Sequence, residues 1–318
     1  MARTSPAMIF GCIVLAGCAQ PPLVLGQVDP ERVLAPEEVQ AGASCTLHKR
    51  ASLPVSLPGL PVITAEINGK PVTLIVDTGA ESSILTAEAA RRVGVTTKYD
   101  FVRSMSGIGK SVRTGDAKLD SMRLGGVALS FPRVLVGDVS FNLGSAQPDG
   151  LLGASLLSDF DLDIDLPHRR IDLYDRLDCA GPRLPWTGRY VTIKTTRSLS
   201  QHPFFPMSVN GKTISASLDS GAQRTVISSR AAAGLGIGAE SRVAGPELHV
   251  RGAAGETLPA ALHTVRDLRV GGIPVRGPVH VVPAALPRDI DALLGFDFLL
   301  NNRVWLSYGS RRLFIQPN

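Results

Sequence analysis

Short hydrophobic runs bounded by turn-forming residues make up most of the chain. The runs at 61–67 and 71–76 are rich in β-branched residues and are joined by Asn68-Gly69. Asn-Gly between two such runs is a specific signal for a β-hairpin with a two-residue turn. The pattern therefore predicts two antiparallel strands, the second of which ends immediately before Asp77.

The residues after this hairpin predict a short helix and then further strands. Thr86 can cap the N-terminus of a helix over 87–93, which Gly94 can end. Beyond it come more short strands, an Asp-x-Leu-Leu-Gly turn at 149–153, a brief helix and a last strand at 170–174. This half of the chain is thus predicted to be mostly β, with one or two short helices.

Almost the whole pattern recurs at one constant offset. The segment Asp219-Ser220-Gly221-Ala222 lies 142 residues after Asp77-Thr78-Gly79-Ala80. The other recurring pairs are 68–70 with 210–212, 84–86 with 226–228, 93–95 with 235–237, and 149–153 with 291–295. A constant offset over so long a span indicates a duplicated domain.

The repeat sets the predicted organisation of the chain. We expect an all-β fold of two pseudo-symmetric lobes with short helices, an N-terminal lobe over 58–180 and a C-terminal lobe over 189–318. A linker at about 182–188 joins them. The chain has 318 residues, of which 44% are hydrophobic, enough for two cores. The formal net charge is +5, but the sequence has no Lys/Arg run and no basic stripe with aromatics, so we do not expect nucleic-acid binding.

The first residues have the features of an export signal. Arg3 precedes an apolar run at 7–15, which is shorter than the roughly 20 residues that a membrane-spanning helix needs. The run ends in Leu15-Ala16-Gly17-Cys18, which resembles a bacterial lipobox. The resemblance implies a signal peptide over 1–17 and a lipid on the Cys18 thiol. The alternative is an ordinary signal peptide with a chance cysteine.

The segment after the signal is poor in periodicity and rich in proline. We interpret 18–57 as a tether or a propeptide. Residue 19 is Ala rather than Asp, which by analogy with enterobacterial sorting favours the outer membrane. The expected location is therefore the periplasmic side of a bacterial envelope, with the membrane bound through the N-terminal lipid.

Two further cysteines, Cys45 and Cys179, bracket the N-terminal lobe. Two cysteines in an oxidising compartment commonly pair, so we expect a disulfide that ties the entry segment to the junction between the lobes. Two free buried thiols are the alternative. No histidine pair at ligand spacing lies near either cysteine, and we expect no metal site.

The duplicated motif resembles a known family at this point. Asp77-Thr78-Gly79-Ala80 and Asp219-Ser220-Gly221-Ala222 each follow an apolar strand and resemble the Asp-Thr/Ser-Gly signatures of retropepsins and pepsins. That clan has a partner motif of two apolar residues and a glycine, which matches the turns that end at Gly153 and Gly295. The resemblance covers both lobes and is closest to bacterial retropepsin-like proteases. It implies an aspartic protease that acts on polypeptides as a monomer, without a cofactor.

The chemistry needs two carboxylates, one from each lobe. Two carboxylates about 3 Å apart share one proton, so the ionised one can activate a water while the protonated one donates to the scissile carbonyl oxygen. The resemblance makes Asp77 and Asp219 this catalytic pair. It implies that Gly79 and Gly221 admit a close backbone approach and donate amides, and that Thr78 and Ser220 bond across the interface. Gly153 and Gly295 are then structural supports.

The residues after the motif suggest how the pair titrates. Pepsins often carry Ser or Thr where this chain has Ala80 and Ala222, and such a hydroxyl favours the ionised carboxylate. Without it we expect the pair to keep its proton to higher pH than in pepsin, and an optimum in the mildly acidic to neutral range.

Glycine-rich segments between strands resemble the flaps of this clan. The first is at 106–110 and contains Gly107, Ile108 and Gly109, and the second is at 251–255 and contains Gly252. Flap tips hold substrate and open and close over it. Ordinary hairpin loops are the alternative in both lobes.

Residues 159–165 alternate acidic and apolar side chains. The alternation predicts a half-exposed strand in preference to a calcium site. The function predicted from the whole sequence is an aspartic endopeptidase that processes envelope proteins. The alternative is a catalytically weak or inactive envelope lipoprotein that binds peptides in the same cleft.

Overall fold

The computed structural model describes most of the chain after residue 45. The described residues are 46–106, 111–176, 184–197, 203–245, 248–251, 257–283, 286 and 290–318. All of them belong to one compact unit, Val33–Asn318. The predictions for Cys18, Cys45, Cys179, Gly107, Ile108, Gly109 and Gly252 lie outside the described residues. Within the described part of the chain, no helix combines the length and the apolar character needed to cross a membrane.

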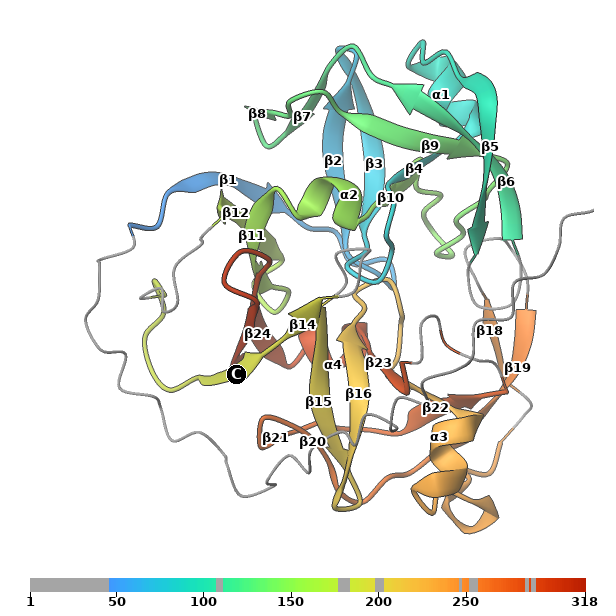
Figure 1. Ribbon diagram of the computed structural model, residues 1–318, viewed down its shortest axis with the longest axis vertical. Helices are drawn as coiled ribbons and strands as arrows, with labels where there is room; N and C mark the ends of the chain where they lie inside the picture. Colours follow the sequence, from blue (N-terminus) through green and yellow to red (C-terminus); the bar gives the residue numbers. More distant parts are fainter. Residues whose placement is uncertain are drawn as a thin grey trace, which may run out of the picture. The chain divides into compact units, whose positions relative to one another are not determined.

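The N-terminal lobe is built on one nine-stranded sheet (Figure 1). Its strand order is β5-β6-β9-β4-β10-β3-β2-β7-β8. The strands are β2 (Val62–Ile67), β3 (Lys70–Val76), β4 (Ile84–Thr86), β5 (Lys98–Ser106), β6 (Ser111–Lys118), β7 (Met122–Leu124), β8 (Val127–Ala128), β9 (Arg133–Gly137) and β10 (Gly150–Leu152). Two short helices, α1 (Ala87–Arg92) and α2 (Ala154–Leu157), complete the lobe.

The C-terminal lobe repeats this arrangement on a second sheet. The order along the sheet is β18-β19-β22-β17-β23-β16-β15-β20-β21, and β14 also pairs with β15. The strands are β14 (Thr196–Arg197), β15 (Pro203–Val209), β16 (Lys212–Leu218), β17 (Val226–Ser228), β18 (Leu248–Arg251), β19 (Thr257–His263), β20 (Leu268–Val270), β21 (Ile273–Pro274), β22 (Val279–Val282) and β23 (Ala292–Leu294). Its helices are α3 (Ser229–Gly234), the 3-10 turn η1 (Ala239–Ser241) and α4 (Phe296–Leu299).

Local sequence signals account for the repeated elements. The hairpin turns have positive φ at both central residues, 50° and 73° at Asn68 and Gly69 and 49° and 77° at Asn210 and Gly211. This is the left-handed geometry that Asn-Gly favours. The Thr86 hydroxyl accepts from the Ala89 amide at 3.0 Å and caps α1, and Ser228 caps α3 in the same way. The predicted hairpins and capped helices are therefore confirmed.

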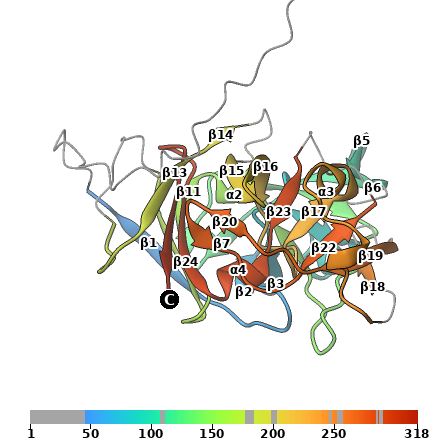
Figure 2. The same cartoon turned by 90° about the horizontal axis from the view of Figure 1, so that it is seen from below.

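A third sheet is shared by the two lobes. Its order is β1-β12-β11-β24-β25-β13, formed by β1 (Lys49–Pro54), β11 (Phe160–Asp165), β12 (Arg170–Asp175), β13 (Val191–Lys194), β24 (Asn302–Ser307) and β25 (Arg312–Pro317). The lobes join where β11 pairs antiparallel with β24, as the two views in Figures 1 and 2 show. The strand β1 lies within 18–57, so the expected tether or propeptide extended too far: its last part is an edge strand of this sheet.

The prediction of a half-exposed strand at 159–165 was correct for the strand and wrong for its exposure. Every residue of β11 is buried, because β11 is a central strand of the shared sheet. The acidic side chains have partners from both lobes. Arg303 holds Asp163 through two bonds of 2.9 and 2.6 Å, the Trp186 indole donates to the same carboxylate at 3.1 Å, and the Arg303 guanidinium lies 5.0 Å from the Trp186 ring.

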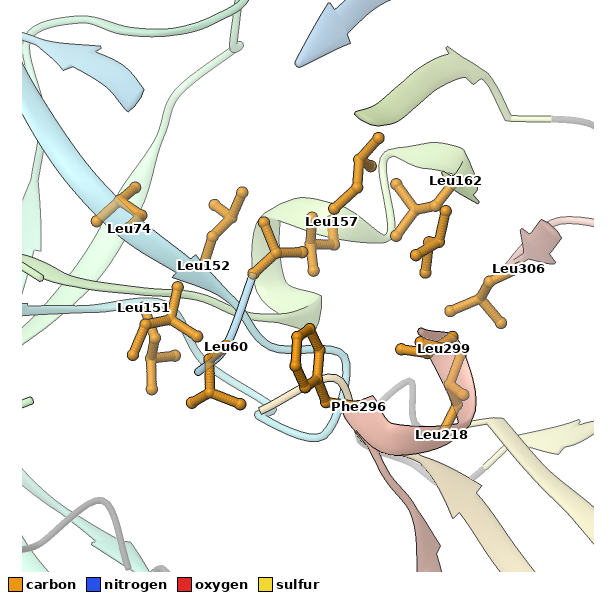
Figure 3. Packing of buried hydrophobic residues seen from close by; sticks show 14 of the residues in the cluster. Leu60, Leu74, Leu151, Leu152, Leu157, Leu162, Leu218, Phe296, Leu299 and Leu306 are labelled. Carbon is orange, nitrogen blue, oxygen red and sulfur yellow. The ribbon is translucent and has the colours of Figure 1, made fainter. Parts of the chain in front are cut away.

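One hydrophobic core runs through both lobes beneath the paired sheets. Figure 3 shows leucines gathered around the two short helices, among them Leu157 of α2 and Leu299 of α4. Leu162 of β11 lies opposite Leu306 of β24 in register, so the core is continuous across the junction. The apolar burial that stabilises each lobe therefore also holds the lobes together.

Candidate active site

The two aspartates stand at equivalent strand ends. Asp77 follows β3 and Asp219 follows β16, and each strand lies parallel to the short Leu-Leu strand of its own lobe, β10 or β23. The Asp77 amide donates to the Leu152 carbonyl at 3.0 Å, and the Asp219 amide donates to Leu294 at 2.9 Å. In each lobe the partner motif therefore fixes the point at which the strand that carries the aspartate leaves the sheet.

Each carboxylate lies against the glycine of the opposite lobe. A Cβ placed on Gly79 would lie 2.3 Å from the Asp219 Cγ, and one placed on Gly221 would lie 2.5 Å from the Asp77 Cγ. Real Cβ atoms do not approach other atoms so closely, so both positions require glycine. The structure thus brings Asp77 and Asp219 into one site through a reciprocal contact.

The loops also hold the ionised form of each carboxyl group. The Gly79 amide donates to Asp77 Oδ1 at 2.9 Å, and the Gly221 amide donates to Asp219 Oδ1 at 2.9 Å. Asp219 Oδ1 accepts a further bond of 3.0 Å from the Ala222 amide. Both aspartates keep part of their surface exposed, so water and a substrate carbonyl can reach them.

Thr78 and Ser220 connect the two loops across the lobes. The Thr78 hydroxyl donates to the Leu218 carbonyl at 2.8 Å, and the Ser220 hydroxyl donates to the Val76 carbonyl at 2.6 Å. Both side chains are buried. Each hydroxyl therefore bonds the strand end that carries the other lobe's aspartate, which is the arrangement that the resemblance implied.

Burial and mutual repulsion control the titration of the pair. Burial raises the pKa of Asp77 well above its ordinary value, and the neighbouring Asp219 carboxylate raises it further. Burial also raises the pKa of Asp219, while the hydrogen bond from Asp77 and the Gly221 and Ala222 amides oppose that rise. The two carboxyl groups share a hydrogen bond, so they titrate as one coupled pair.

The supporting glycines pack under the aspartate loops. A Cβ on Gly153 would lie 2.8 Å from the Ala80 carbonyl oxygen, and one on Gly295 would lie 2.5 Å from the Arg224 carbonyl carbon. The next amides donate back to the loops, Ala154 to Ala80 at 2.8 Å and Phe296 to Ala222 at 2.7 Å. These contacts fix the position of each aspartate loop relative to the short helix of the same lobe, α2 or α4.

Sequence reasoning missed a hydroxyl under each loop. The Ser83 hydroxyl accepts from the Gly153 amide at 3.0 Å, and the Thr225 hydroxyl accepts from the Gly295 amide at 3.2 Å. Thr225 in turn donates to Asp297 at 2.9 Å. Ser83 and Thr225 have the same offset as the aspartates, so the internal repeat contained the signal that could have found them.

A second missed pair of residues ties the partner motif to the aspartate strands. The Asp149 carboxylate accepts from the Thr73 amide at 2.9 Å, and the Asp291 carboxylate accepts from the Ser215 amide at 3.1 Å. Although burial opposes it, the Arg92 guanidinium at 2.7 Å and the Thr73 amide lower the pKa of Asp149. The acidic residue of the Asp-x-Leu-Leu-Gly turn is therefore structural.

Comparisons with known proteins agree with this geometry. The sequence signature of the family described as "Aspartyl protease" matches residues 63–156 and 205–298, once in each lobe. The chain is also 32% identical over 117 residues to the DNA damage-inducible protein 1 of Kluyveromyces lactis. That match covers 36% of this chain and 26% of the relative, so it spans only about a quarter of the relative's length. Each match surrounds one Asp-Thr/Ser-Gly loop, and the two matches together cover more than half of the chain. The chain therefore belongs to the aspartyl protease family and is retropepsin-like.

Proposed function

We propose that this protein is an aspartic endopeptidase with one active site, formed by Asp77 and Asp219 of a single chain. The observation that carries the proposal is the reciprocal contact in which each carboxylate lies against the glycine of the other loop. A chain that needed only the fold would not require both carboxylates at the same point, where each raises the cost of ionising the other.

The arrangement assigns a role to each carboxyl group. Burial and the Asp219 carboxylate raise the pKa of Asp77 well above its ordinary value, so the proposal places the shared proton on Asp77. In the proposed reaction Asp219 takes a proton from water as the water oxygen bonds to the peptide carbonyl carbon. Asp77 gives its proton to the carbonyl oxygen, which yields a tetrahedral diol. A proton then passes from the pair to the leaving nitrogen as the C–N bond breaks, and the diol proton restores the singly protonated pair.

Contacts from both lobes hold the two aspartate loops in place, which suits this chemistry. The loops are tied across the lobes by Thr78 and Ser220 and supported from below by Gly153 and Gly295. Preorganised carboxylates do not have to move as charge develops in the transition state. The flap segments that contain Gly107, Ile108, Gly109 and Gly252 complete the proposed site by covering the bound peptide.

We further propose that the enzyme is a monomeric lipoprotein of the bacterial envelope. The support is the lipobox-like segment that ends at Cys18 and the tether that follows it. Its substrates would then be polypeptides on the periplasmic side of the membrane, and the outer membrane is the proposed anchor site. Labelling with a radioactive fatty acid tests the anchor directly, because a Cys18→Ser chain should lose the label.

The proposed disulfide between Cys45 and Cys179 is supported by the register of the shared sheet. Strands β1 and β12 are antiparallel with Lys49 opposite Tyr174, and the Asp175 amide donates to the His48 carbonyl at 2.9 Å. His48 follows Cys45 by three residues and Asp175 precedes Cys179 by four, so the two cysteines flank neighbouring positions of the sheet. Mass mapping without a reductant should recover one peptide pair linked through these residues, and two free thiols would contradict the proposal.

A digest of a peptide library by the purified protein tests the proposed activity. The intact chain should cleave internal peptide bonds, and Asp77→Asn and Asp219→Asn should each abolish cleavage. Asp175→Asn is the matched control, because this half-exposed carboxylate ends β12 of the shared sheet and its ion-pair partner is Arg50. Peptides that bind to the intact chain without being cut would favour the alternative, an inactive peptide-binding lipoprotein.

A further inference from the structure

The loop between β8 and β9 carries Phe131, whose side chain is not packed in the hydrophobic core. Phe131 has 84% of its surface exposed, far more than Val243 or Leu300, the other exposed large hydrophobic residues in the described part of the chain. Its φ is 50°, a left-handed conformation that a bulky residue rarely adopts. Single exposed hydrophobic residues are common, but an exposed one held in an unfavourable backbone conformation calls for a reason outside the fold.

The equivalent turn of the C-terminal lobe has a glycine where this lobe has Phe131. In both lobes a Gly-Gly turn closes the preceding hairpin, Gly125-Gly126 in one and Gly271-Gly272 in the other. At the same separation from that turn, and again just before a proline, the C-terminal lobe has Gly277 with φ 87°. A Cβ added there would meet nothing within 4 Å. Glycine therefore satisfies the turn, and Phe131 replaces it at a conformational cost.

Basic residues surround Phe131 in the sequence and in the strand pairing. Lys118 lies directly opposite Arg133 in the β6–β9 ladder, and both are exposed. Like charges directly opposite each other are unfavourable for a sheet. Arg123 of the neighbouring hairpin is also exposed, but the exposed Glu66 lies directly opposite it in the β2–β7 ladder, and Asp120 is a further exposed acidic residue of the region. The positive charge next to Phe131 therefore comes from the Lys118–Arg133 pair, which the bond from the Leu119 amide to the Pro132 carbonyl holds beside the loop, and this pair suits an anionic partner.

This surface lies next to the strand by which the chain enters the lobe. A Cβ on Gly125 would lie 2.7 Å from the Leu53 side chain and 3.0 Å from that of Ala51, so the β7–β8 turn packs on β1. The segment that contains Cys18 leads into β1.

We propose that Phe131, with Lys118 and Arg133, contacts an anionic lipid surface and orients the anchored enzyme on its membrane. The aromatic ring would enter the interface between headgroups and acyl chains, and the basic side chains would bind lipid phosphates. The choice of a lipid surface over a protein partner rests on the proposed anchor. A short contact of this kind adds little affinity by itself, but it fixes an orientation once the lipid has brought the lobe to the surface.

Tryptophan fluorescence of the full lipidated chain in vesicles tests the contact. The two natural tryptophans, Trp186 and Trp305, are buried, so a Phe131→Trp chain reports the loop over a low background. In phosphatidylglycerol vesicles that contain brominated lipid, we expect the added tryptophan to lose at least about half of its emission. A Leu300→Trp chain places the probe in the other lobe and should be quenched several-fold less. Lys118→Glu with Arg133→Glu, and vesicles of phosphatidylcholine alone, should both reduce the quenching.

The same vesicles separate the possible failures. If the chain sediments with vesicles but Phe131→Trp is not quenched, the contact is wrong and the anchor stands. If the chain does not sediment with vesicles at all, the anchor and the contact both fail. Phe131→Gly should fold and cleave free peptides as the natural chain does, because it restores the glycine of the other lobe. A loss of peptide cleavage, or a loss of self-association in the absence of lipid, would assign Phe131 to a substrate or to a second copy and overturn the proposal.

Discussion

Thr78 and Ser220 form a reciprocal pair across the two lobes. The Thr78 amide donates to the Ser220 hydroxyl at 3.0 Å, and the Ser220 amide donates to the Thr78 hydroxyl at 3.1 Å. Each hydroxyl also donates to a carbonyl of the opposite strand, so each one closes two bonds between the lobes. The position of one aspartate relative to the other therefore depends on these two side chains.

Replacing Thr78 tests this dependence. Thr78→Ala leaves the buried Ser220 amide and Leu218 carbonyl without their partner and should lower the free energy of unfolding by about 3 kcal/mol. Thr78→Ser is the control, because the C-terminal lobe already uses serine at this position and the hydroxyl is kept. Urea unfolding measures both, and equal stability of the two variants would show that the hydroxyl bonds contribute nothing.

Gly79→Ala should damage the site more than its size suggests. The added methyl would lie 2.3 Å from the Asp219 Cγ, so one loop must move and the pair must separate. We expect cleavage of a peptide substrate to fall at least a hundredfold, since small displacements of catalytic groups have effects of that order. Gly234→Ala in α3 is the matched control, because a Cβ there meets nothing within 4 Å. Activity of Gly79→Ala within a few-fold of the natural chain would contradict the close approach.

The pH dependence of cleavage should reflect the shared proton. Activity requires that the pair holds one proton, and the raised pKa of Asp77 extends this range upward from an ordinary carboxyl value. We therefore expect an optimum in the mildly acidic to neutral range. Ala80→Ser adds a hydroxyl donor to the Asp77 loop, which favours the ionised carboxylate and should move the upper limb of the profile to lower pH. An unchanged upper limb would contradict the account in which the Asp77 carboxyl group sets that limb.

Stability should fall as pH rises through the titration of the pair. Because the pKa of Asp77 is raised in the folded state, the folded chain binds more protons than the unfolded chain between the ordinary and the raised value. The free energy of unfolding then decreases with increasing pH in that window. Asp77→Asn removes this titration while its amide oxygen can still accept from Gly79. Urea unfolding in a series of buffers should give a shallower pH slope for Asp77→Asn than for the control Asp175→Asn.

The sequence predicted those parts of the fold that depend on local signals. The Asn-Gly turns, the caps at Thr86 and Ser228 and the strand that ends at Asp77 all follow from residues that are neighbours in the chain. The duplication then placed the second aspartate, since equivalent residues of the two lobes occupy equivalent positions. The resemblance of both copies to the Asp-Thr/Ser-Gly signature is why the carboxylates, their glycines and the hydroxyls between the loops could be named in advance.

The parts that were missed depend on partners far away in the sequence. β1 alternates buried and exposed residues only over a short run that begins at Ala51 and contains Pro54, and it forms by pairing with β12. The acidic residues of β11 suggested exposure, since a buried carboxylate is costly when it lacks a partner. The partner of Asp163 is Arg303, which lies 140 residues later, and no local sequence pattern indicates this pairing. Similarly, the left-handed φ of Phe131 is visible only in the structure.

The central claim is that two lobes of one chain build one catalytic pair. It is tested most directly by the rate of peptide cleavage for the natural chain, for Asp77→Asn, for Asp219→Asn, and for an equal mixture of the two variants. We predict that each variant alone and the mixture are inactive, because no chain in the mixture contains both carboxylates. Cleavage by either variant at a rate near that of the natural chain would contradict a catalytic pair. Recovery of activity in the mixture would show that the site forms between two chains.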